Sequence, residues 1–302
     1  MSILNRPSDG LFNILIVLVR CLAHHGSMDR EKLINVCAPE SAVDSQDRAK
    51  QTLNNWVQLG LLNEDTGKIS IDRGLSSVVK KSTDHSALAR LARQRVLASD
   101  NNERFWEAKN NRSADFSRAA SWMLAQNVFE VQVNGHKAIE EIEIAQLSED
   151  EEFRAFTNQT RWTSYKAWAP FLGFGSIGRF PTKNTFVIDP TVAVADSLGE
   201  VFGKDKELPQ EQFFSRLAEI LPVVDGGEYR IKVEEKIDQS KWKPPKPSEV
   251  STSLSRALRR LHSRGDIVLD NRSDANKRTL IGRNGGAIGD DVSHVIWKGG
   301  KK

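Results

Sequence analysis

The fold of this chain is decided most clearly by residues 247–281, which read PSEVSTSLSRALRRLHSRGDIVLDNRSDANKRTLI. The pattern predicts a helix that opens at Pro247-Ser248-Glu249, runs to Ser263 and is stopped by Gly265. A helical wheel separates its side chains into an apolar face and a polar face. The apolar face holds Val250, Leu254, Ala257, Leu258 and Leu261, and the outward face holds Thr252, Ser255, Arg256, Arg259 and Ser263, with Arg260 at its flank.

After this helix the sequence predicts a strand at 266–269, a polar turn at 270–278 and a return strand at 279–281. The helix, first strand and basic turn resemble the recognition helix and wing of MarR-type winged-helix proteins. In that family the helix enters the major groove, and the wing reaches a neighbouring minor groove or a phosphate. The resemblance implies DNA contacts by Thr252, Ser255, Arg256, Arg259 and Arg260 on the helix, and by Arg272, Lys277 and Arg278 on the wing.

The N-terminal 82 residues have the same order of elements. We expect a helix capped by Ser8 or Asp9 in the turn at 7–10 and ending near His25, a short helix at 31–36 capped by Ser27 or Asp29, and a third helix at 45–58. Leu61-Leu62, a turn at 63–67 and a strand at 68–71 then form a hairpin, which completes the order of a winged helix-turn-helix.

The third of these helices has one apolar stripe, formed by Ala49, Leu53, Trp56, Val57 and Gly60. Its opposite face includes the candidate DNA-contacting residues Arg48, Gln51, Asn54 and Asn55, whose side chains can bond base edges in the major groove. A solvated helix surface is the more common interpretation of such a face, and Asp47 opposes DNA contact through its negative charge.

The region between these modules, 83–204, is expected to be mostly helical, with amphipathic segments at 87–97 and 113–126 and an acidic one at 140–152. In the helix at 158–171, Trp162, Tyr165 and Trp168 recur at helical spacing, which favours a core stripe over a base-stacking platform. A hairpin at 177–188 follows, so a third winged-helix-like unit is expected at about 158–190. A basic C-terminal domain then spans 205–302, with its first helix at 209–224.

The composition of the chain limits the classes of protein to which it can belong. The 302 residues include 39% hydrophobic and 27% charged residues, which is typical of soluble globular proteins. Two cysteines exclude a disulfide scaffold. The apolar run at 11–19 is too short to cross a membrane, so a cytoplasmic protein without membrane contact is expected.

Residues 240–302 contain 14 Lys or Arg against 6 Asp or Glu, a charge asymmetry that favours contact with nucleic acid. The basic connector at 241–247, KWKPPKP, is interpreted as a solvated loop rather than a phosphate contact.

No motif predicts an active site, a metal site or a cofactor. Residues 173–178, GFGSIG, match the dinucleotide-binding pattern, but the predicted helix precedes them and the predicted strand follows, which is the reverse of the required order. The histidines lack metal-ligand spacing. We therefore expect a non-enzymatic protein that has neither metal nor cofactor.

The whole chain resembles the DpdG family, accessory proteins of bacterial 7-deazaguanine DNA-modification and restriction clusters. Ser8-Asp9-Gly10-Leu11 before the apolar helix, and winged-helix ends around a helical middle, carry the resemblance. It implies a non-catalytic, DNA-associated subunit that works beside larger nuclease or helicase subunits in phage defence.

The sequence thus predicts a mainly α fold with small β-hairpins, built of tandem winged helices that bind double-stranded DNA mostly through phosphates, with the C-terminal module as the main contact. Three alternatives stay open. The winged helices could bind partner proteins in an assembly, the protein could be a stand-alone transcriptional regulator acting as a homodimer, or it could be an enzyme whose site is unrecognised.

Overall fold

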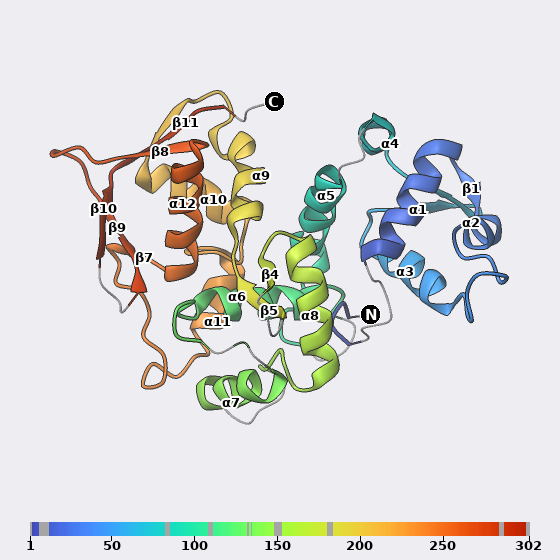
Figure 1. Ribbon diagram of the computed structural model, residues 1–302, viewed down its shortest axis with the longest axis horizontal. Coiled ribbons are helices and arrows are strands. Elements are labelled where there is room, and N and C mark those ends of the chain that lie inside the picture. Colours follow the sequence, from blue (N-terminus) through green and yellow to red (C-terminus); the bar gives the residue numbers. More distant parts are fainter. Residues whose placement is uncertain are drawn as a thin grey trace. The chain divides into compact units, whose positions relative to one another are not determined.

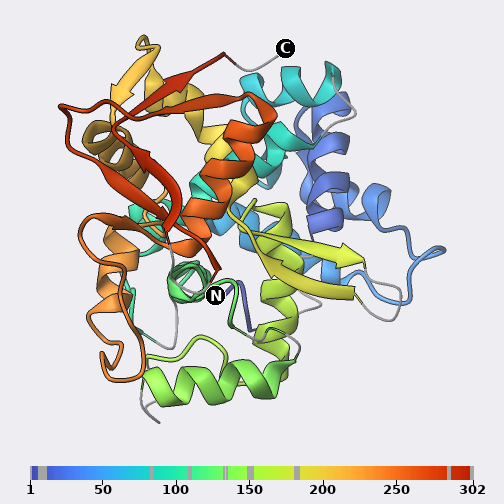
Figure 2. The same ribbon diagram turned by 60° about the vertical axis from the view of Figure 1, so that its left-hand side comes forward.

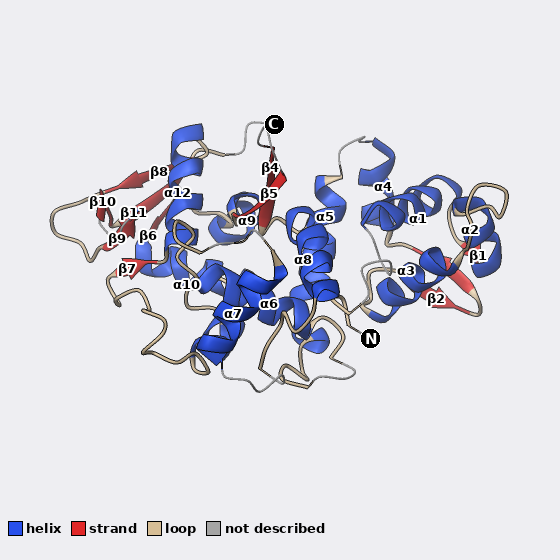
Figure 3. Ribbon diagram, turned by 60° about the horizontal axis from the view of Figure 1, so that its bottom comes forward, coloured by secondary structure: helices blue, strands red, loops and turns tan. Residues whose placement is uncertain are grey.

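The computed structural model describes residues 2–5, 12–81, 85–107, 111–131, 133, 135–147, 153–179, 184–283 and 287–299. The chain divides into two compact units: unit 1 is residues 1–116 with 158–172, and unit 2 is residues 117–157 with 173–302. Helices predominate, and the strands of the described residues form small sheets of two or three strands (Figure 3). The predicted class, mainly α with small β elements, is confirmed.

Unit 1 begins with the three helices and the hairpin that the sequence predicts (Figure 1). Asp29 caps the second helix by accepting hydrogen bonds from the amides of Glu31 and Lys32. The turn at 7–10, with the capping residues expected there, lies outside the described residues. The elements are α1 (Phe12–His25), β1 (Met28–Asp29), α2 (Arg30–Cys37), α3 (Asp47–Gln58), β2 (Asn63–Asp65), β3 (Lys68–Ser70), α4 (Arg73–Lys81), α5 (Ser86–Leu97), the 3-10 helix η1 (Ser99–Asn101), the start of α6 (Ala114–Ala125) and α8 (Gln159–Phe171).

The hairpin of unit 1 has a tighter turn than the sequence suggests. Its first strand is β2, and only Thr66 and Gly67 lie between β2 and β3. Both residues have positive φ (49° and 78°), as a two-residue hairpin turn of type I′ requires. The short strand β1 adds to β3, so the sheet order is β1-β3-β2 with antiparallel pairing throughout.

The aromatic stripe of α8 is part of the core of unit 1, as predicted. Trp162, Tyr165 and Trp168 are at most 4% exposed. The Trp168 ring lies 5.4 Å from that of Trp56, which comes from the buried face of α3. Burial of all three rings excludes a base-stacking platform on this helix, because stacking requires an accessible ring face.

Unit 2 combines helices with three small sheets in its described residues. Figure 2 shows β8 to β11 beside α12 and α10. The elements are the remainder of α6, α7 (His136–Leu147), β4 (Gly175–Arg179), β5 (Asn184–Ile188), α9 (Thr191–Phe202), β6 (Glu207–Pro209), α10 (Gln210–Ile220), α11 (Glu228–Glu234), β7 (Glu249–Val250), α12 (Thr252–Arg264), β8 (Ile267–Asp270), β9 (Arg278–Ile281), β10 (Ala287–Val292) and β11 (His294–Trp297).

The C-terminal strands pair differently from the predicted hairpin. β8 pairs with β11, and the order of that sheet is β6-β11-β8. β9 pairs with β10 and, in parallel, with β7. The expected pairing of 266–269 with 279–281 is therefore wrong, and the segment between β8 and β9 connects two sheets. Strands farther along the chain compete for the edges that a local hairpin would use.

The helix and hairpin expected to form one module at 158–190 fall into different units. α8 belongs to unit 1, whereas the two-stranded sheet of β4 and β5 belongs to unit 2. The helix ends as predicted: Gly173 follows it with a φ of 85°, a left-handed conformation that glycine adopts without strain. Residues 180–183 between the strands lie outside the described residues.

Candidate nucleic-acid interface

The predicted recognition helix α12 is a core element of unit 2. It packs against α9, β8 and β9, and seven of its 13 residues are buried. The Ser255 hydroxyl donates to the carbonyl of Val250 and accepts from the amide of Ile281, both at 3.0 Å. Thr252 Oγ1 accepts from the amide of Val128 at 3.0 Å. The outward placement predicted for Thr252 and Ser255 is therefore wrong, because the polar side of the helix is also covered by protein.

The arginines of α12 contact groups within unit 2. The guanidinium of Arg256 lies 4.8 Å from the centroid of the Phe129 ring. Burial, and then the neighbouring charge of Arg260, lower the pKa of Arg256. Arg260 forms an ion pair with Asp189, just before α9. Arg259 is half-buried. Contact with phosphate would require Arg256 and Arg260 to exchange these internal partners.

The basic residues of the predicted wing lie on the connection between β8 and β9. Arg272 bridges two acids: its Nη2 lies 2.6 Å from Glu207 Oε1 and its Nε 2.9 Å from Asp270 Oδ2. These bonds, that to Asp270 foremost, raise the pKa of Arg272. The guanidinium of Arg278 lies 4.9 Å from the centroid of a phenylalanine ring. Lys277 is half-exposed and forms no ion pair with a described residue.

The predicted polar face of α3 does lie on the surface of unit 1. Arg48 and Asn54 are exposed, and Gln51 and Asn55 are half-exposed. Asn54 Oδ1 accepts a hydrogen bond from the guanidinium of Arg30, which belongs to α2. The structure thus brings the four candidates of α3 together on one accessible face. The candidates of α12 and of the wing lie in the other unit, mostly with internal partners.

Two features of unit 1 near this face were missed by the sequence reasoning. Lys50 is exposed one turn before Asn54, and its place beside that residue on the helical wheel was the available signal. A groove of about 730 Å³ lies between α1, α2 and the start of α3. It is lined in part by Val17, which is 45% exposed, and by Val43, which is 37% exposed. Exposed apolar side chains that gather in a groove are typical of protein-binding surfaces.

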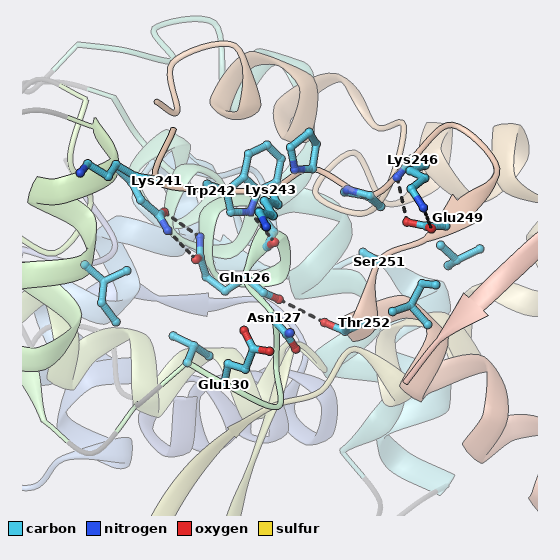
Figure 4. Close-up of a pocket in the computed structure, with 18 of the residues that line it drawn as sticks. Gln126, Asn127, Glu130, Lys241, Trp242, Lys243, Lys246, Glu249, Ser251 and Thr252 are labelled. Atoms are coloured by element: carbon cyan, nitrogen blue, oxygen red, sulfur yellow. Dashed lines mark hydrogen bonds and ion pairs between the residues drawn. The ribbon is translucent and has the colours of Figure 1, made fainter. Parts of the chain in front are cut away.

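Unit 2 contains a cavity of about 740 Å³ that the sequence reasoning also missed (Figure 4). It lies between the end of α6, the loop after it and the connector at 240–246. Lys241 and Lys243 are exposed at its edge, and Trp242 between them is buried. A tryptophan flanked by lysines is the signal in the sequence, whereas the lysines and prolines of this connector favour a solvated loop.

Other features of the described residues constrain the chemistry. Gly175 lies within β4, where an added Cβ would meet the ring of Phe186 at 2.5 Å, so its role is close packing. The run at 173–178 therefore leaves α8 and enters a strand, as predicted, and does not begin a helix.

Among the described residues no cluster of His, Cys, Asp or Glu could hold a metal ion. None of the described helices is long and apolar enough to cross a membrane.

Comparison with known proteins identifies the family of the chain. No curated protein and no solved structure matches the chain. The DpdG-like family matches residues 1–275, which confirms the whole-chain resemblance inferred from the sequence. Similarity to that family is compatible with a role as an accessory protein in a DNA-modification cluster. Since the match extends over 275 of its 302 residues, the chain belongs to the DpdG-like family.

Proposed function

We propose that this protein is a non-enzymatic accessory subunit of a bacterial DNA-modification and restriction system, and that it contacts duplex DNA through the polar face of α3. Its family membership supports the accessory role. The observation that carries the DNA contact is the accessible polar face of α3, set in the order α1–β1–α2–α3–β2–β3. That order is the one in which winged-helix proteins present their recognition helix.

The charged residues of α3 suit contact with phosphate. Arg48 and Lys50 are exposed, and neither forms an ion pair with a described residue. Cations without an internal partner can neutralise phosphates without first breaking a bond, and phosphate contacts supply most of non-specific affinity. Asn55 lies two turns from Arg48 on the same side of the helix, whereas Lys50 lies one turn from Asn54. Asn55 offers both a donor and an acceptor to a base edge. The α12 arginines lack this freedom, which moves the proposed contact from unit 2 to unit 1.

The charge balance around α3 favours a supporting role over tight independent binding. Residues 29–70 contain seven acidic and five basic residues. Acidic side chains close to DNA raise the cost of approach and limit affinity at physiological salt. An accessory subunit held near DNA by larger nuclease or helicase subunits needs only such a weak contact. A stand-alone regulator would have to bind DNA more tightly, because no larger subunit would hold it there.

The test is binding of the full-length protein to a labelled duplex between about 50 and about 200 mM salt. Replacing Arg48 and Lys50 together by Ala should weaken binding for every sequence. It should also reduce the slope of log K against log salt by about 1.8, which corresponds to two lost phosphate contacts. The control, K204A/K206A, changes two exposed lysines of unit 2 and alters the net charge equally. Equal binding by the two double variants contradicts the assignment to α3.

Assembly with a partner protein is the second candidate, and the groove lined by Val17 and Val43 favours it. Replacing both valines by Ser should abolish co-purification with a larger subunit of the system while leaving duplex binding unchanged. Loss of a homodimer in sedimentation would instead assign the groove to a second copy of the chain. Unchanged assembly in both measurements rejects the groove as an interface.

A further inference from the structure

We propose that the cavity of unit 2 binds a nucleotide, with its phosphate on Lys241 and Lys243 and its base in the interior. The cavity lies entirely within unit 2, and its volume of about 740 Å³ falls in the range of ligand pockets. This inference goes beyond the proposed duplex contact and does not depend on it, because the residues involved belong to another unit than α3.

The connector is fixed to the cavity wall by its central aromatic residue. Trp242 is 6% exposed, and its Nε1 donates to the carbonyl of Ala125 at the end of α6 (3.0 Å). The amide of Asp238 donates to the carbonyl of Gln146 (2.8 Å), which ties the start of the connector to α7. Pro244 follows closely and limits the conformations of the backbone. These anchors hold the lysines on either side of Trp242 at the edge of the cavity.

The two lysines supply positive charge at the edge of the cavity. Hydrogen bonds from Ser240, and then the charge of Lys241, lower the pKa of Asp238, so this carboxylate lies near one of the two lysines. Lys246, the third lysine of the connector, is neutralised by Glu249, with Nζ 3.1 Å from Oε1. Lys241 and Lys243 are exposed, and neither ammonium group forms an ion pair with a described residue. Ammonium groups at the mouth of a concave site are suited to a phosphate, which lysine binds as a point charge.

The interior offers a polar pair that can recognise a base edge. Gln126 and Gln146 bond each other through both amides, at 3.0 Å each, and Trp122 Nε1 donates to Gln146 Oε1 at 2.9 Å. An amide nitrogen has two N–H groups, so Gln146 Nε2 keeps one donor for a ligand acceptor. Buried polar groups with fixed partners orient a ligand without reorganisation.

The wall opposite the connector combines apolar surface with the carboxylate of Glu130. Val131, Ile142 and Ile281 line the cavity and can cover the faces of a planar base. Asn127 and Glu130 lie on the loop after α6, opposite the connector (Figure 4). The Glu130 carboxylate accepts hydrogen bonds only and would repel a phosphate, so it suits the amino group of a base or a sugar hydroxyl. Cations at one wall and a carboxylate at the other therefore give the ligand a direction.

The experiment is calorimetric titration of the full-length protein with the four 2′-deoxynucleoside 5′-monophosphates. Parallel titrations use the unphosphorylated nucleosides, inorganic phosphate and a short 5′-phosphorylated single strand. We expect at least one monophosphate to bind more tightly than both its nucleoside and inorganic phosphate. Tighter binding of the single-stranded DNA than of the monophosphate would identify a DNA end as the natural ligand. Tighter binding of the monophosphate would identify a free nucleotide.

The variant K241A/K243A should weaken nucleotide binding by at least about tenfold, since two charge-assisted contacts are lost. K204A/K206A, with the same change of net charge, should bind as the parent does. The proposal is overturned by no heat up to about 1 mM monophosphate, by equal binding of inorganic phosphate, or by unchanged binding in K241A/K243A. Duplex binding by this variant should persist, so failure here and failure of the α3 assignment are distinguishable.

Discussion

Replacing Asp115 by Ala should destabilise unit 1 more than most single changes would. Asp115 lies in the first turn of α6 and is fully buried. Its carboxylate accepts hydrogen bonds from the hydroxyl of Ser2 and the amides of Ile3 (3.3 Å) and Leu4 (2.8 Å). Arg161 Nη2, from α8, lies 3.7 Å away. One side chain thus joins the N-terminal segment to two helices.

The magnitude follows from what the substitution leaves behind. Arg161 has a side chain only 9% exposed, so its charge would stay buried without its ion-pair partner. Breaking a buried pair from one side costs about 3–5 kcal/mol. The buried amide of Leu4 also loses its acceptor, and an unsatisfied group of this kind costs about 1–3 kcal/mol. Because these contributions share one site they are not additive, and we expect a loss of about 4 kcal/mol from the free energy of unfolding.

The measurement is urea denaturation followed by circular dichroism, with limited proteolysis of the N-terminal segment as a second readout. Asp115→Ala should lower the unfolding midpoint and speed cleavage near residues 2–5. Asp44→Ala is the matched control, because Asp44 is exposed and its loss should change stability by less than about 0.5 kcal/mol. Equal midpoints for the two variants would refute the argument that Asp115 organises this part of unit 1.

Two further predictions follow from pKa shifts. The backbone amide of Lys246 donates a hydrogen bond to Glu249 and lowers the pKa of that carboxyl group. The ionised carboxylate therefore stabilises the folded protein above its unfolded pKa, and this stability is lost as the pH falls through the lower folded pKa. Glu249→Gln should therefore cost about 1 kcal/mol at pH 7, and a cost that persists unchanged at pH 3 in denaturant titrations would contradict this. Burial, with the neighbouring Cys21, raises the pKa of the Cys37 thiol to about 12. Its alkylation by iodoacetamide at pH 8 should be about a thousandfold slower in folded than in unfolded protein, as read by mass spectrometry, and equal rates would show that the thiol is not perturbed.

Local features of the sequence determined most helices of this protein. Asp29 before α2 and Asn158 before α8 cap their helices through side-chain oxygens. Gly173 and Gly265 end α8 and α12 in left-handed conformations. Such signals act within a few residues, so they can be identified without knowing the rest of the fold. The polar face of α3 is equally local, and it was predicted because only one side of that helix is covered.

Tertiary structure decided which polar faces are accessible and which strands pair. A helical wheel assumes one buried face, but α12 is covered by α9 as well as by β8 and β9, so Ser255 is interior. β11 takes the edge of β8 that a local hairpin would have used, and Asp189 and Glu207 neutralise arginines far along the chain. The cavity of unit 2 needs Gln126, Gln146 and Trp242 from separate elements. Strand pairing, ion pairs and cavities depend on contacts between distant residues, and sequence periodicity describes only neighbours.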